Sequence, residues 1–115
     1  MTDDPDDQVP DHGDMELFDL RVVVESIGGR SVCGLSVGDY IDLVDSSRLQ
    51  LPPGRHFCVF ALASVLPLLA AKQRRLPEAD WLERDTLVSC PDPEEGLVMR
   101  IERTRRVVLD STELT

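Results

Sequence analysis

Residues 57–71 read FCVFALASVLPLLAA and form the longest apolar run of the chain. Apolar residues recur on one face at helical spacing, at Cys58, Leu62, Val65 and Leu69. The positions between them leave hardly any polar face, so we expect a helix from Arg55 to Lys72 that is buried on all sides. Pro67 should kink this helix or end its first part. The run is shorter than the ~20 residues that a membrane span requires, so we expect no membrane span.

Stretches on both sides of this run alternate between apolar and polar residues, which is typical of strands. The clearest stretch covers residues 17–27, and others cover 37–44, 86–90 and 97–109. Glycine, proline and aspartate residues between the stretches supply turns. The sequence therefore predicts an α+β fold, in which a small antiparallel sheet in β-β-α-β-β order packs on one long apolar helix.

The beginning of the chain differs in charge from the rest. Residues 1–16 contain no base but carry the acids Asp3, Asp4, Asp6, Asp7, Asp11, Asp14 and Glu16, within a chain of net charge −10. Such a segment has little to bury, so we expect a disordered acidic arm over residues 1–15 that helps solubility. One α+β domain over residues 16–109 and a frayed end over 110–115 complete the expected organisation.

Composition also narrows the partners and the compartment. An acidic chain repels phosphate backbones, so we expect no nucleic-acid binding. The sequence shows no basic and apolar signal peptide, and cysteines without such a signal indicate free thiols in a reducing compartment. We therefore predict a cytoplasmic protein. Neither a glycine-rich phosphate loop nor a Gly-x-Ser-x-Gly elbow is present.

The three cysteines are Cys33, Cys58 and Cys90, and they form no Cys-x-x-Cys pair. Three thiolates and His56, which is the only histidine within the predicted fold, would make a tetrahedral zinc site. Three thiolates with an open position could instead hold iron or copper. Core packing is the alternative, because cysteine is a small residue that is often fully buried.

Two residues are candidates for catalysis. Cys58 lies near the amino end of the predicted helix, where backbone N–H groups favour a thiolate and Arg55 and His56 add positive potential. Burial among apolar neighbours would oppose its ionisation. Asp92 lies between two prolines, where shaping of a hairpin is the alternative to a role as a catalytic carboxylate.

Basic residues gather in two groups, Lys72, Arg74 and Arg75, and Arg100, Arg103, Arg105 and Arg106. They could hold the anionic group of a hydrophobic metabolite, or they could simply lie at the end of a helix and along a solvent-exposed strand edge.

A small sheet cannot cover an apolar helix on all sides, so we also predict a homodimer whose interface includes Phe60, Ala63 and Leu66.

Several landmarks follow one another in a distinctive order. They are Cys33, Val37-Gly38-Asp39, Pro53-Gly54, Phe57-Cys58, Trp81 and Ser89-Cys90-Pro91-Asp92-Pro93. This order resembles a family of small prokaryotic proteins of about one hundred residues, the size of one domain. Its members carry three separated cysteines and a Cys-Pro-Asp-Pro turn. The resemblance covers residues 17–103 and implies a single fold unit, but it assigns no chemistry because no activity is established for that family.

Three functional hypotheses follow from these observations. The first is a metal or cluster site that could hold zinc or iron, with Cys33, Cys58 and Cys90 as thiolate ligands. The second is a small enzyme or accessory protein that acts on a hydrophobic metabolite through Cys58 or Asp92. The third is a non-catalytic homodimeric interaction module.

Overall fold

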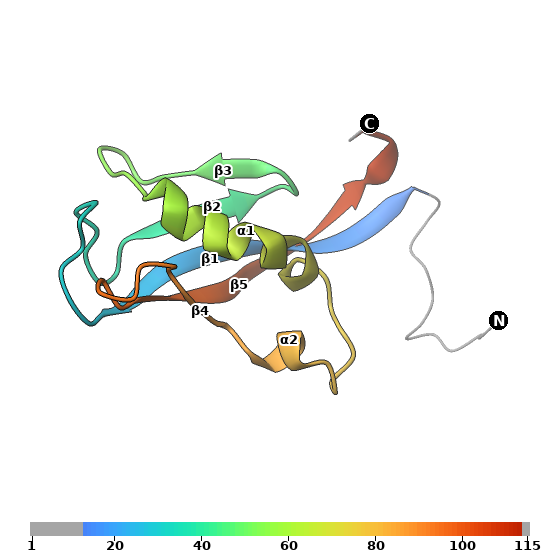
Figure 1. Ribbon diagram of the computed structural model, residues 1–115. Coiled ribbons are helices and arrows are strands. Elements are labelled where there is room, and N and C mark those ends of the chain that lie inside the picture. The colour runs from blue at the N-terminus through green and yellow to red at the C-terminus, as the bar shows by residue number, and fades with distance from the viewer. Residues whose placement is uncertain (1–12, 114–115) are drawn as a thin grey trace.

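Two long strands form the centre of the protein, as the computed structural model shows for residues 13–113 (Figure 1). Strand β1 (Asp14–Ile27) and strand β5 (Leu97–Asp110) pair antiparallel from one end to the other. The register shifts at two places, between Asp19 and Leu20 and between Val24 and Ser26. This long ribbon is the frame on which all other elements lie.

Three short strands extend the ribbon to a five-stranded antiparallel sheet with the order β3-β2-β1-β5-β4. They are β2 (Tyr40–Val44), β3 (Arg48–Gln50) and β4 (Leu87–Ser89). Asp45 and Ser46, at the turn between β2 and β3, take the left-handed backbone conformation that aspartate tolerates better than most residues. Strand β4 pairs with the first part of β5 and forms the opposite edge of the sheet.

Helix α1 (Val59–Lys72) lies across one face of the sheet (Figure 1). Its buried apolar residues Ala61, Val65 and Leu69 are four positions apart and therefore share one face. This face packs on a core built from alternate strand residues, Leu20, Val22, Val24, Leu97, Met99 and Ile101. Helix α2 (Trp81–Arg84) is one short turn, and a 3-10 turn (Ser111–Glu113) follows β5.

The expected fold class is wrong, because the protein is mainly a five-stranded sheet and no long apolar helix is present among residues 13–113. Helix α1 has fourteen residues and begins at Val59 instead of Arg55. Before it, Cys58 is extended and Phe57 is partly buried against the core. The chain is therefore extended where Phe57 and Cys58 pack against the core, and it becomes helical only from Val59 onward.

The expected burial of the helix on all sides is also wrong. The outer face of α1 is open to solvent, and Phe60 is 69% exposed. The helix continues past Pro67 and ends at Lys72, which is the end that the sequence predicts. The sheet is large because β1 and β5 pair over fourteen residues each, yet it covers only one side of the helix.

The predicted acidic arm falls mainly on residues 1–12, which lie outside the described residues. Strand β1 already includes Asp14 and Met15, and β5 includes Asp110. Among residues 13–113, no helix is long and apolar enough to cross a membrane.

Candidate functional site: a pocket lined by three thiols

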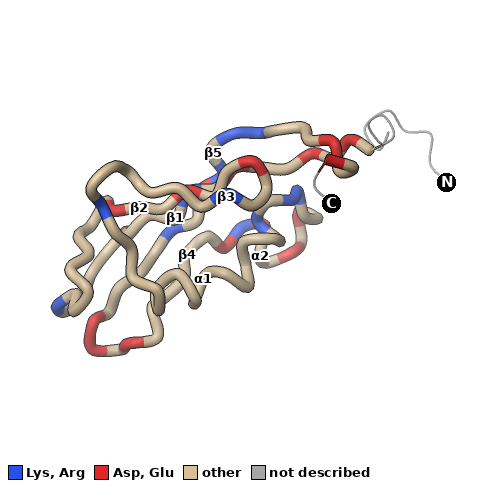
Figure 2. The backbone as a smooth tube through the Cα atoms, turned by 90° about the horizontal axis from the view of Figure 1, so that it is seen from above, with Lys and Arg blue, Asp and Glu red and all other residues tan. Residues whose placement is uncertain are grey.

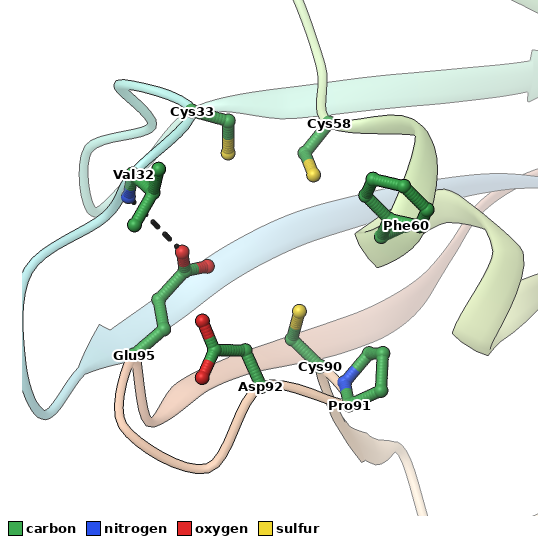
Figure 3. Close-up of a pocket in the computed structure, with 8 residues that line it drawn as sticks. All are labelled: Val32, Cys33, Cys58, Phe60, Cys90, Pro91, Asp92 and Glu95. Atoms are coloured by element: carbon green, nitrogen blue, oxygen red, sulfur yellow. Dashed lines mark hydrogen bonds between the residues drawn. The ribbon is translucent and has the colours of Figure 1, made fainter.

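A cavity of about 470 Å³ opens where the loop after β1, the start of α1 and the turn between β4 and β5 meet (Figure 3). It is lined by Val32, Cys33, Cys58, Phe60, Cys90, Pro91, Asp92 and Glu95. All three cysteines of the chain therefore contribute to one cavity, which we call the thiol pocket. None of them is in a disulfide.

Local backbone structure places each thiol. Cys33 lies in a turn in which the Ser31 hydroxyl accepts a hydrogen bond from the Leu35 N–H (3.0 Å) and lies 3.6 Å from the Cys33 sulfur. Cys58 is the N-cap of α1, and its carbonyl accepts the Leu62 N–H (2.9 Å). Cys90 follows β4 directly, where its N–H donates to the Leu97 carbonyl (2.9 Å).

Burial and two neighbouring side chains determine the pKa of the Cys33 thiol. Burial raises the pKa of the Cys33 thiol. The nearby Ser31 hydroxyl opposes this rise in pKa, and the Cys58 thiol reinforces it. A cysteine whose pKa lies above its ordinary value is protonated at neutral pH, so Cys33 presents a thiol and not a thiolate.

His56, the predicted fourth metal ligand, contacts the backbone of Cys33 and does not line the thiol pocket. Its Nε2 lies 2.7 Å from the Cys33 carbonyl oxygen, and its side chain does not line the pocket. The ring thus fastens the Cys33 loop to the segment before α1. Within residues 13–113, no group of three or more His, Cys, Asp and Glu side chains has the arrangement of a metal site.

Glu95 also lines the pocket, although no feature of the sequence marks it as a site residue. Its side chain is buried, with 5% exposed, and one carboxylate oxygen accepts the Val32 N–H (3.1 Å). The other oxygen, Oε1, is buried and has no hydrogen-bond partner in the described part of the chain. Figure 3 shows this carboxylate beside the cavity, on the same side as that of Asp92.

Two glycines explain why Glu95 points inward. Gly28 and Gly29 lie against the turn between β4 and β5, where the Gly29 N–H donates to the Glu95 carbonyl (2.9 Å). A Cβ atom on Gly29 would lie 2.1 Å from the Glu94 carbonyl oxygen, so a larger residue could not approach this closely. The close contact fixes the turn and directs the Glu95 side chain toward the pocket.

Asp92 shapes the turn between β4 and β5, as one of the two interpretations of the sequence predicts. Its carboxylate accepts the Glu94 N–H (3.1 Å), and its carbonyl accepts the Gly96 N–H (3.3 Å), so it shapes the turn. It also lines the thiol pocket, together with Cys58. The structure therefore brings the two predicted catalytic residues to the same cavity.

The two groups of basic residues do not form an anion pocket there. None of the eight residues drawn around the thiol pocket is a base. Several arginines instead pair with carboxylates elsewhere, as in Arg103 with Glu83 (2.7 Å) and Arg105 with Asp19 (3.0 Å). A ligand that enters this cavity meets thiols, apolar groups and carboxylates.

Comparisons with other proteins leave the pocket as the basis for functional inference. No known protein family matches the sequence, and neither curated proteins nor solved structures gave a match. The resemblance to the three-cysteine family stays a prediction. What the protein does must therefore be inferred from the chemistry of the thiol pocket itself.

Proposed function

We propose that the protein binds a small, mainly apolar molecule in the thiol pocket. The observation that carries this proposal is the cavity of about 470 Å³. Pockets for small molecules measure roughly 300–1,000 Å³ and combine apolar walls with a few convergent polar groups. Val32, Phe60 and Pro91 supply apolar walls here, and Asp92 and Glu95 supply polar groups.

The thiols fit this proposal as wall residues. A neutral thiol is small, polarisable and weakly polar, so it makes favourable contacts with apolar groups. Cys90 is buried in the core cluster, and the raised pKa of Cys33 keeps that residue protonated. Cys58 and Asp92 are the groups through which a bound molecule could react, as expected for an enzyme or accessory protein.

A blocked pocket tests the proposal. Val32 lines the cavity and is 72% exposed, whereas Val37 is 62% exposed and is not among the lining residues. We expect Val32→Trp to abolish binding of apolar fragments, observed as shifts of backbone amide NMR signals, and Val37→Trp to leave binding unchanged. Fragments that shift no signals of pocket residues in the unmodified protein would contradict the proposal.

Convergence of the three cysteines favours a second candidate, a soft metal ion held by Cys33, Cys58 and Cys90. Binding would require rotation of the side chains and loss of the thiol protons. The test is the metal content of anaerobically purified protein, with about one ion per chain expected for a tetrahedral site. Cys58→Ser should lose the ion and His56→Ala should keep it, since His56 lies outside the pocket. Absence of metal from the unmodified protein, before and after titration, would exclude this candidate.

The outer face of α1 supports a further part of the proposal, that two copies associate. This face carries no charge before Lys72, as Figure 2 shows, and Phe60 and Leu66 are exposed on it. Apolar residues on one face of a helix are a common dimer surface. We expect a dimeric mass by light scattering for the unmodified protein and a monomeric mass for Leu66→Glu.

We also propose a cytoplasmic location for the protein, because its three thiols are free.

A further inference from the structure

We infer that the ligand of the thiol pocket is cationic and carries a protonated amine that donates to Glu95 Oε1. This inference rests on the proposed ligand pocket and specifies the chemical class of its ligand. Three observations carry it: a buried oxygen without a donor, an excess of carboxylates around the cavity, and an aromatic wall.

The first observation is the state of the Glu95 carboxylate. Oε2 accepts the Val32 N–H at 3.1 Å, whereas Oε1 has no donor among residues 13–113. Roughly nine in ten or more of the buried polar groups in proteins have a hydrogen-bond partner, so each exception requires an explanation. A buried carboxylate beside a cavity is explained when the ligand supplies the missing donor.

The second observation is the charge of the surroundings. Two carboxylates, those of Asp92 and Glu95, and no basic residue line the thiol pocket, so its lining has a formal charge of −2. A carboxylate or phosphate ligand would be repelled, whereas an ammonium group would be attracted.

The third observation is the wall opposite the carboxylates. Phe60 is the aromatic residue of the lining, and Figure 3 shows it across the cavity from Glu95. An aromatic ring attracts a cation and also packs against an apolar body. An alcohol could donate to Oε1 too, but only an ammonium group adds the attraction between two opposite charges.

The test compares three charge forms of the same apolar skeletons. The probes are hexyl, cyclohexylmethyl and 2-phenylethyl compounds, each as amine, alcohol and carboxylate, titrated at neutral pH in the presence of a chelator. For the unmodified protein we expect the amines to bind at least about tenfold more tightly than the alcohols, and the carboxylates to bind most weakly. This preference is measured without any variant, so it does not depend on how a variant folds.

Two neighbouring glutamates provide a matched pair of variants. Glu95→Gln keeps an acceptor for the Val32 N–H but removes the charge, so amine affinity should fall about tenfold while alcohol affinity stays within about twofold. Glu94→Gln removes the same charge from the exposed neighbouring residue, which does not line the thiol pocket, and should change amine affinity by less than about twofold.

The outcomes separate the inference from the proposed function. Equal affinity for amines and alcohols, or an unchanged amine affinity in Glu95→Gln, would overturn the inference and leave the pocket in place if Val32→Trp still abolishes binding. Binding of none of the nine compounds would overturn both. An amine preference that disappears in Glu95→Gln and persists in Glu94→Gln is the supporting result.

Discussion

Lys72 and Glu95 are both buried charged side chains, but their surroundings differ. Lys72 is 2% exposed, and its ammonium group donates to the Leu82 carbonyl (2.6 Å) and is 3.4 Å from the Asp85 carbonyl. Glu95 is buried almost as deeply, yet one of its carboxylate oxygens has no donor in the described chain. A buried charge whose hydrogen-bond partners lie in the chain belongs to the fold and is costly to disrupt, whereas one without a donor points to a ligand.

The surroundings of Lys72 are a closed network at the end of α1. Arg103 of β5 donates to the Lys72 carbonyl (2.9 Å) and the Arg74 carbonyl (2.7 Å). The same guanidinium holds the Glu83 carboxylate through two hydrogen bonds of 2.7 Å and lies over the Phe18 ring. Each group named in this network has a hydrogen-bond partner within the chain. The region around Lys72 therefore requires no ligand to complete it.

Removal of the Lys72 ammonium group should have the largest effect on stability. Lys72→Met keeps most of the side-chain stem but leaves the Leu82 carbonyl without its donor, so the free energy of unfolding should fall by about 2 kcal/mol. Urea unfolding measures the change. Arg74→Met, at an exposed position two residues after the end of α1, is the control and should change stability by less than about 0.5 kcal/mol. Equal effects of the two variants would show that Lys72 is not held as the structure indicates.

Acid should weaken the same network. The hydrogen bonds from Arg103 are the main reason that the pKa of Glu83 is lowered from 4.5 to about 2. In this range the unfolded chain binds more protons than the folded protein, so the contribution of Glu83 is full above pH 4.5 and is lost as the pH falls toward about 2. Unfolding curves across this range should show a smaller loss for Glu83→Gln than for the unmodified protein. An unchanged slope would contradict the assignment.

The two long strands could be predicted because their residues alternate between the buried and the exposed face of the sheet. The strands over 17–27 and 97–109 stand out in the sequence since one face of each is buried, and β1 and β5 include them. Strand β3 could not be found in this way, because all three of its residues are exposed and its pairing with β2 defines it. The start of α1 was missed because apolar residues before Val59 pack on the core while extended.

The pocket was harder to predict than the strands. The three cysteines were recognised as candidates, but their spacing in sequence does not say whether they converge, and that depends on loops that meet only in the folded sheet. Glu94 and Glu95 are equivalent in a polar turn between prolines and glycine. Which of them turns inward is decided by Gly28 and Gly29, which are more than sixty residues away in the chain.

Removal of the Glu95 charge should have the smallest effect on stability, and the opposite sign. Glu95→Gln keeps the acceptor for the Val32 N–H and removes a buried charge that lacks a second partner, so the free energy of unfolding should rise by up to about 1 kcal/mol. Glu94→Gln is the exposed control and should leave urea unfolding unchanged. A loss of stability in Glu95→Gln would mean that the carboxylate is held by the fold as Lys72 is, and the contrast between the two buried charges would disappear. A gain, together with weaker amine binding, would show that this residue is kept for its ligand at the expense of stability.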